Sequence, residues 1–414
     1  GLSPDSVIGA RQAECGFDVW CRDDGLWAVG PDGPYDAKRS PYNEYLKSKG
    51  YGGENPWADF SNAGLSGDEI ASGWFMKNAD RPANIEEGDS ETPWLTSEAI
   101  KFMETATGPW CAHISYIKPH WPYIVPAPYH NMYSAKDILP AVKDRAELQD
   151  PHPVYEAFAT GRIGKSFSRD DVREKVIPVY MGLIKQIDDH LGRLFDWLEE
   201  TGRDRDTMIV LTSDHGDYLG DHWMGEKELF HECSVRVPLI ICDPRPEADA
   251  TRGTACDALV EAIDLVPTFL EATGAPPADH RLEGRSLMPL LQGETPEDWR
   301  DAVLSEIDYA FYAARETLDV GLSEARAYML RSERWKYVYY RGFPPQLFDL
   351  ENDPEEFRDL GRDPAYQAER DRMQAALLDR LTARKNRVTM TDAGVRAMRR
   401  DEDESGIMIG KWGA

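Results

Sequence analysis

The densest group of chemically capable side chains in the sequence is the eleven-residue string Thr212-Ser-Asp-His-Gly-Asp-Tyr-Leu-Gly-Asp-His222. It follows a β-rich run, Thr207 to Leu211. Ligands of open α/β sheets bind outside the carboxyl ends of strands. A carboxylate oxygen beside an imidazole nitrogen suits a divalent cation. We therefore predict that Asp214 and His215 hold a metal ion. A lone Asp-His pair would more often be a solvated turn, but the whole string at a strand end disfavours that interpretation.

A second polar group follows another short apolar run, Trp110 to Tyr116. Prolines 119 and 122 should end this predicted strand and leave Lys118 and His120 at its mouth. For Lys118, a solvated lysine is an equally good interpretation. Two further histidines, His222 and His231, lie near the first string, where they could act directly or hold their neighbours in place.

Strands that alternate with helices should position these groups. Apolar residues recur at spacings of three and four over 169–200, which predicts a long helix that stops at Gly202. Val235 to Cys242 is a buried-type strand, and residues 257–273 indicate a helix that ends at Gly274. This alternation predicts an α/β fold with a mostly parallel central sheet flanked by helices.

The pattern changes after about residue 300. Residues 328–331 and 334–340 predict a hairpin, and a helix with Met373 and Leu377 on one face follows. We predict an α/β domain over 1–300, an α+β subdomain with an antiparallel sheet over 301–384, and an extended arm over 385–414. The apolar residues of the arm, Ile407 to Ile409 and Trp412, could dock on a neighbouring subunit.

Composition excludes several kinds of partner. The formal net charge is −27, and such a surface repels nucleic acid and anionic membranes. No apolar run approaches the roughly 18 to 20 residues of a membrane span. The six cysteines include no Cys-x-x-Cys pair, so neither a disulfide framework nor a zinc knuckle is predicted. Cys111 and Cys242 sit in apolar runs and should be reduced core thiols, which predicts a cytoplasmic protein.

These strings together resemble the sulfatase branch of the alkaline phosphatase superfamily. The resemblance spans roughly residues 100 to 365, and segment 127–130 and the extended tail look most like phosphonate monoester hydrolases. The segments that carry it are 118–122, 186–193, 212–222 with Lys227, 232–241, 264–268, 283–287 and 347–356.

The resemblance implies an alkaline-phosphatase-like fold and one divalent metal ion, Mn, Ca or Mg. It also implies a formylglycine nucleophile. Asp214 and His215 match two metal ligands of the family, Lys227 the lysine that binds substrate oxygens, and His120 the histidine at the leaving-group oxygen or ester anion. Metal and cations would stabilise charge that develops on the transferring group.

The expected function is hydrolysis of small anionic esters, namely phosphonate monoesters or phosphodiesters, with overlapping activity on sulfate monoesters. A dedicated sulfatase for an alkyl, aryl or sugar sulfate is the alternative within enzymes. A non-catalytic remnant that binds metal and anions is the alternative from another class. The resemblance also implies a homotetramer, assembled through the C-terminal arm.

The family nucleophile lies in Cys-x-Pro-x-Arg or Ser-x-Pro-x-Arg, and no cysteine here has that context. Cys242-Asp-Pro-Arg245 has its arginine one position early, and Asp23-Asp24 follows no buried strand. We therefore expect Gly1 to correspond to a point well inside a full-length member, with the formylglycine upstream of this chain. An omitted segment is favoured over a fragment or a pseudoenzyme.

Overall fold

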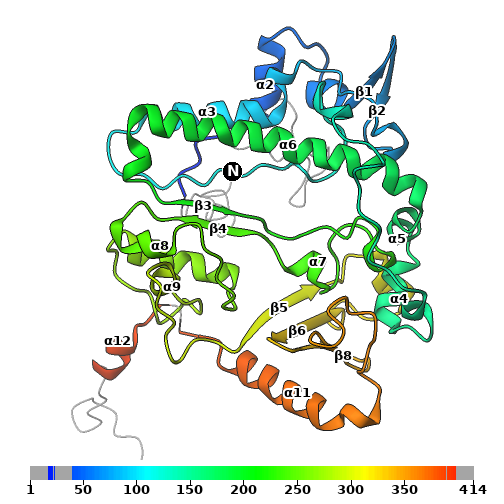
Figure 1. The fold of residues 1–414 in the computed structure, drawn as a ribbon, viewed down its shortest axis with the longest axis vertical. Helices are drawn as coiled ribbons and strands as arrows, with labels where there is room; N and C mark the ends of the chain where they lie inside the picture. The colour runs from blue at the N-terminus through cyan, green and yellow to red at the C-terminus, as the bar shows by residue number, and fades with distance from the viewer. Residues whose placement is uncertain (1–16, 22, 24–39, 388, 398–414) are drawn as a thin grey trace, which may run out of the picture. The chain divides into compact units, whose positions relative to one another are not determined.

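The computed structural model describes residues 17–21, 23, 40–387 and 389–397. They form two compact units (Figure 1). The first unit holds the described residues up to 141 together with 165–205, and the second holds 142–164 and the described residues from 206 onward. No helix in these described ranges is long and apolar enough to cross a membrane. The segment Ile407 to Ile409 and Trp412, on which the docking prediction rests, lies outside the described residues.

The first unit is built around α6 (Asp170–Thr201), which confirms the helix predicted over 169–200. Its buried side includes Val176, Val179 and Leu183, and Gly202 ends it in the left-handed conformation, with φ 71°. In Figure 1, α3 (Glu91–Thr105) runs alongside α6. The other elements are α2 (Pro41–Ser48), η3 (Trp57–Ser61), the hairpin β1 (Ala63–Ser66) and β2 (Glu69–Ser72), η4 (Met76–Asn78), η5 (Glu87–Asp89), η6 (Tyr129–Asn131) and η8 (Arg203–Arg205).

The strand predicted over 110–116 is wrong. These residues are extended, with half-buried and exposed side chains in strict alternation, but they belong to no strand. A strand needs a neighbour for its backbone N–H and C=O groups, and no strand in the described ranges pairs with this segment. Cys111 lies on the exposed side of the alternation, so the prediction of a core thiol is also wrong there.

The second unit carries β3 (Ile209–Thr212) and β4 (Leu239–Cys242), shorter versions of two predicted strands. They pair antiparallel, with Ile209 opposite Cys242. Parallel pairing within the described residues is confined to one isolated bridge, Pro82 with Val125, so the mostly parallel sheet is not seen in these ranges. Cys242 is exposed at the end of β4, again contrary to prediction.

The second unit also holds several short helices. The helix predicted over 257–273 is present only as η11 (Ala262–Asp264) and α8 (Leu265–Ala272). The remaining elements before residue 300 are η7 (Arg145–Leu148), α4 (Pro153–Ala159), η9 (Asp221–Trp223), α7 (Glu232–Val235), η10 (Pro246–Thr251) and α9 (Met288–Leu291). Helix α5 (Arg162–Phe167) spans the boundary of the two units.

The C-terminal part confirms the predicted antiparallel sheet and helix. Strands β5 (Ala302–Asp308), β6 (Arg326–Ser332), β7 (Trp335–Tyr340) and β8 (Gln346–Asp349) pair antiparallel in that order. Helix α11 (Gln367–Thr382) packs Met373 and Leu377 against Leu330 and Tyr337 (Figure 1). The shorter helices are α10 (Ala313–Thr317), η12 (Pro364–Tyr366) and α12 (Asp392–Ala397). The domain limits at 300 and 384 stay a prediction, because the two compact units divide the chain elsewhere.

A buried core fixes the segment between β3 and β4 in the second unit. Tyr218, Met224 and Phe230 from this segment pack in one cluster with Met329 and Tyr340 of the C-terminal sheet. The residues after the β3 end therefore rest on the sheet formed by the last third of the chain.

Candidate functional site

Asp214 and His215 lie immediately after β3, as predicted. The Asp214 side chain is 83% exposed, and the Oδ2 atom of its carboxylate lies 3.4 Å from Nε2 of His215. The backbone N–H of His215 donates to the other carboxylate oxygen at 3.0 Å. Ser213 Oγ donates to the His215 carbonyl at 2.8 Å, which closes the turn. The two side chains thus face a common point at the end of a strand.

The hydrogen bond on the other ring nitrogen makes His215 fit a metal ion. Its Nδ1 lies 2.7 Å from the Gly216 carbonyl, which can only accept, so Nδ1 carries the proton. In the neutral ring, Nε2 then keeps its lone pair, the usual arrangement of a metal-binding histidine. Ligand bonds of about 2.4 Å at right angles, as around Ca²⁺, would place an oxygen and a nitrogen about 3.4 Å apart. The Asp214–His215 pair therefore suits a divalent cation, for which it supplies two ligands.

Gly216 holds this turn against α7. Its N–H donates to the Ser234 carbonyl at 2.8 Å. A Cβ atom at this position would lie 1.9 Å from the Cys233 carbonyl oxygen, a distance that requires the backbone to move. Only glycine allows two backbone segments this close, so the Asp-His-Gly order has a packing reason as well as a chemical one.

Lys227, the predicted substrate-binding lysine, is half-buried in the second unit and follows β3 through the same segment. Its carbonyl accepts a hydrogen bond from Ser234 Oγ at 2.5 Å, and its N–H donates to Glu228 at 3.2 Å. The segment that carries Lys227 is thus tied to α7, as the Asp214–His215 turn is.

Two carboxyl groups beside Lys227 were not predicted from the sequence. Burial, and then the neighbouring Glu228 carboxylate, raise the pKa of Glu226 to about 7, while Lys227 acts in the opposite direction. Burial and the hydrogen bond to Glu228 raise the pKa of Tyr312. Glu226 can therefore retain a proton near neutral pH. The signal was the Glu-Lys-Glu order itself, which alone also fits a solvated turn.

His120, the predicted leaving-group histidine, lies in the first unit. Its Nδ1 is 2.8 Å from the Trp121 carbonyl, so this nitrogen carries the proton and the neutral ring keeps a lone pair on Nε2. The ring contacts the Trp121 indole, with centroids 4.6 Å apart, and Trp121 in turn contacts Trp74 at 5.3 Å. The structure brings Asp214, His215 and Lys227 into one unit; His120 belongs to the other unit, and its role stays a prediction.

Lys118 is buried, so the solvated alternative is wrong. Its Nζ donates to Asn62 Oδ1 at 3.1 Å and to the Pro122 carbonyl at 2.8 Å. Burial lowers the pKa of Lys118, opposed by the nearby Glu91 carboxylate, and burial raises the pKa of Glu91. Both side-chain oxygens of Glu91 are buried without a hydrogen-bond partner in the described ranges. Lys118 therefore connects the two ends of the 118–122 segment, which contains His120, and ties that segment to Asn62.

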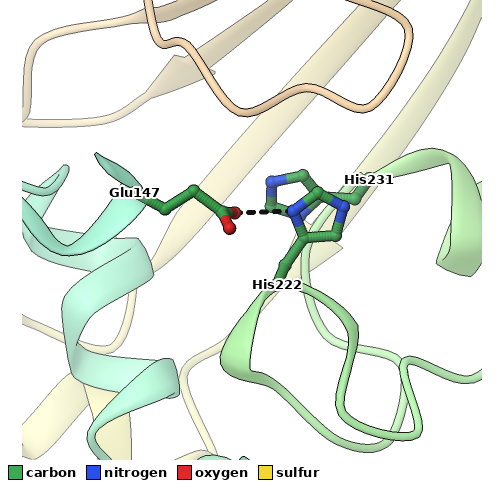
Figure 2. A group of neighbouring side chains, drawn as sticks. All are labelled: Glu147, His222 and His231. Atoms are coloured by element: carbon green, nitrogen blue, oxygen red, sulfur yellow. Dashed lines mark hydrogen bonds and ion pairs between the residues drawn. The ribbon is translucent and has the colours of Figure 1, made fainter. Parts of the chain in front are cut away.

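Glu147, His222 and His231 form a buried group in the second unit, shown in Figure 2. Nδ1 of His222 donates to Glu147 Oε1 at 2.7 Å, and the two imidazole rings stack with centroids 3.9 Å apart. Burial, and then the neighbouring His222, lower the pKa of His231 well below its usual range. Tyr218 Oη lies 2.8 Å from Nδ1 of His231. The sequence had marked both histidines, but nothing local pointed to Glu147.

Known protein families match most of the chain. A family model described as Sulfatase matches residues 40–275, and one described as N-sulphoglucosamine sulphohydrolase, C-terminal, matches residues 220–384. The chain is 36% identical over 322 residues to the multifunctional alkaline phosphatase superfamily protein PehA of Trinickia caryophylli, which covers 73% of this chain and 62% of PehA. The chain thus spans less than two thirds of PehA.

Two further similarities cover more of the chain. The arylsulfatase of Clostridium perfringens (strain 13 / Type A) is 27% identical over 384 residues, or 91% of this chain and 74% of that protein. The structure resembles the phosphonate monoester hydrolase SpPMH from Silicibacter pomeroyi with a TM-score of 0.75 and 30% identity, over 86% of this chain and 72% of that one. This similarity confirms the predicted alkaline-phosphatase-like fold class.

Proposed function

Since the chain belongs to the sulfatase branch of the alkaline phosphatase superfamily, we propose that it is part of a metal-dependent hydrolase of phosphonate monoesters and phosphodiesters, with overlapping action on sulfate monoesters. The observation that carries the proposal is the Asp214–His215 pair at the end of β3. Its carboxylate oxygen and imidazole Nε2 lie 3.4 Å apart, and Nδ1 of the ring is held by a backbone carbonyl. The similarity to SpPMH, a phosphonate monoester hydrolase, supports a phosphonate monoester as substrate.

In this proposal Asp214 and His215 hold one divalent ion, Mn, Ca or Mg, which supplies Lewis-acid stabilisation of charge on the transferring group when bound. Lys227 binds the anionic oxygens of the substrate, and His120 contacts the leaving-group oxygen or the ester anion. The nucleophile is a formylglycine on a segment upstream of this sequence, because none of the cysteines of the chain lies in Cys-x-Pro-x-Arg. A proton on Glu226 would reduce the negative charge that an anionic ester meets beside Lys227.

The remaining parts of the proposal concern the cell. We propose a cytoplasmic protein that binds neither nucleic acid nor membranes and assembles as a homotetramer through residues 385–414. An unchanged sedimentation profile after deletion of residues 386–414 would refute the role of the arm in assembly.

The first experiment is mass spectrometry of the protein as expressed, intact and after trypsin, with a search for peptides upstream of Gly1. A formylglycine in such a peptide is the expected result. Hydrolysis of p-nitrophenyl phenylphosphonate, bis(p-nitrophenyl) phosphate and p-nitrophenyl sulfate would then rank the substrates. We expect turnover of the first two to exceed that of the sulfate.

The variant Asp214→Asn links turnover to the metal pair. It should lower kcat/KM by more than about 100-fold. The loss of a residue that only holds a metal ligand in place usually costs about 10- to 100-fold, so the larger loss would indicate that Asp214 binds the metal itself. Asp249→Asn, which changes another exposed carboxylate, is the control and should leave activity unchanged. A clear preference for the sulfate ester would favour the dedicated sulfatase, which the similarity to arylsulfatase supports. Metal and anion binding without turnover would favour the non-catalytic remnant.

A further inference from the structure

We infer that Glu147, His222 and His231 form a second metal site, which takes a borderline divalent cation such as Zn²⁺ and shares no residue with the Asp214–His215 pair. Each of these three side chains offers one atom that can bind a metal, and the three atoms lie within 4.8 Å of one another. Among the described residues, this is the group of three or more such side chains that meets this distance. Two imidazoles with one carboxylate are a ligand set that proteins use for zinc and other transition metals.

The burial of the group supports a metal site over a chance meeting of polar residues. The side chains of Glu147 and His222 are 5% and 4% exposed, and His231 is 6% exposed. Exposed acidic and imidazole groups cluster on many surfaces, but buried ones need compensation. The three come from separate segments, η7, η9 and the start of α7, and converge in Figure 2.

The surroundings of the group hold its side chains by their remaining polar atoms. Glu147 accepts from the Asp144 N–H at 2.7 Å through Oε2, while Oε1 faces His222. The Tyr218 hydroxyl forms a hydrogen bond with Nδ1 of His231, so Nε2 is the ring nitrogen that would bind an ion. A metal-binding histidine is usually held in this way on its second nitrogen.

The backbone of His222 is held in an unusual conformation. Its φ is 48°, and Trp223 beside it has a φ of 58°. Side chains other than glycine rarely adopt such values, and strained residues of this kind cluster at functional sites. The backbone is fixed there by hydrogen bonds from His222 N–H to the Val142 carbonyl and from the Tyr155 hydroxyl to the His222 carbonyl.

Charge near the group favours a dication. Lys336, which lowers the pKa of His231 together with burial and His222, is itself paired with Glu232 and Glu356. Arg331 also pairs with Glu232, at 3.6 Å, so, counting Glu147, three carboxylates stand against two cations. An ion would take the position of the proton that His222 now donates to Glu147, and that proton would move to Nε2 of the same ring. One ring would turn out of the stack so that a nitrogen of each reaches the ion. Three protein ligands leave a position for water.

The test uses the full chain in the Asp214→Asn/His215→Asn background, which removes the other predicted ion. Protein stripped with a chelator is titrated with Zn²⁺ and with Co²⁺, and bound metal is counted by plasma mass spectrometry. We expect one bound ion per chain and the visible absorption of Co²⁺ in a site with nitrogen ligands.

Two variants and one control decide the outcome. His222→Gln and His231→Gln should each weaken binding by more than about 100-fold and remove the Co²⁺ absorption. The control His152→Gln changes another buried histidine of the same unit, which forms a hydrogen bond with the Pro344 carbonyl. This variant should keep both the metal affinity and the Co²⁺ absorption. If a histidine variant does not fold by circular dichroism, Glu147→Gln decides instead, with an expected loss of at least about tenfold. A background protein that binds no ion, or variants with unchanged affinity, would overturn the inference.

Discussion

Replacing Lys336 with methionine should destabilise the second unit severely, because this lysine is completely buried. Its Nζ lies 2.5 Å from Glu356 and 2.8 Å from Glu232, and it donates to the Phe230 carbonyl at 2.8 Å. The Glu356 side chain is only 1% exposed. Methionine fills a similar volume but would leave the Glu356 carboxylate buried without its cation and the Phe230 carbonyl without a donor.

The size of the effect follows from this burial. Removing one partner of a buried ion pair costs about 3–5 kcal/mol, a large share of the roughly 5–15 kcal/mol that stabilises a typical domain. For a unit of this size, each kcal/mol shifts Tm by about 2–4 °C, so we expect a loss of about 6–20 °C. The cost should grow with pH. Burial already raises the pKa of Glu356 and Lys336 opposes that shift, so without Lys336 the folded state binds a proton on Glu356 more tightly and loses stability as pH rises.

Urea unfolding followed by circular dichroism measures the loss of stability. The matched control is Lys101→Met, which replaces an exposed lysine of α3. Its free energy of unfolding should lie within about 0.5 kcal/mol of that of the wild type. The double variant Lys336→Met/Glu356→Gln removes both charges and should regain much of the stability. A single variant that loses less than about 1 kcal/mol, or a double variant no more stable than the single one, would refute the reasoning.

Two further changes test the site segment. The raised pKa of Glu226, about 7 against an ordinary 4.5, means that its contribution to stability is complete below pH 4.5 and is lost as pH rises through 7. Glu226→Gln should therefore flatten the pH dependence of the free energy of unfolding by roughly 1–2 kcal/mol after allowance for its partial exposure. An unchanged slope would contradict a proton held on Glu226. Gly216→Ala should cost about 1–3 kcal/mol, because its Cβ would lie 1.9 Å from the Cys233 carbonyl oxygen. Gly192→Ala in α6, where nothing lies within 4 Å, should instead stabilise slightly, and equal stabilities of the two alanine variants would exclude the proposed close contact.

The local sequence pattern was sufficient to predict the elements that depend mainly on residues close to one another in the chain. The apolar spacing over 169–200 and the glycine after it predicted α6, since side chains three and four apart share one helix face. The runs 328–331 and 334–340, joined by two residues, predicted the β6–β7 hairpin because both strands lie next to each other in the chain. The position of Asp214 and His215 at a strand end could be predicted because the strand directly precedes them in the sequence.

Partners distant in the chain were beyond such reasoning. Glu147 meets His222 across 75 positions, and Lys336 reaches Phe230 across 106. The strand predicted over 110–116 failed because pairing depends on a neighbour that local propensity does not supply. Cys242 has a buried-type sequence but faces outward. Composition and periodicity specify which side chains are available and which local conformation they prefer. Burial, hydrogen-bond partners and shifted pKa values arise only when the folded chain removes particular groups from water and places particular charges beside them.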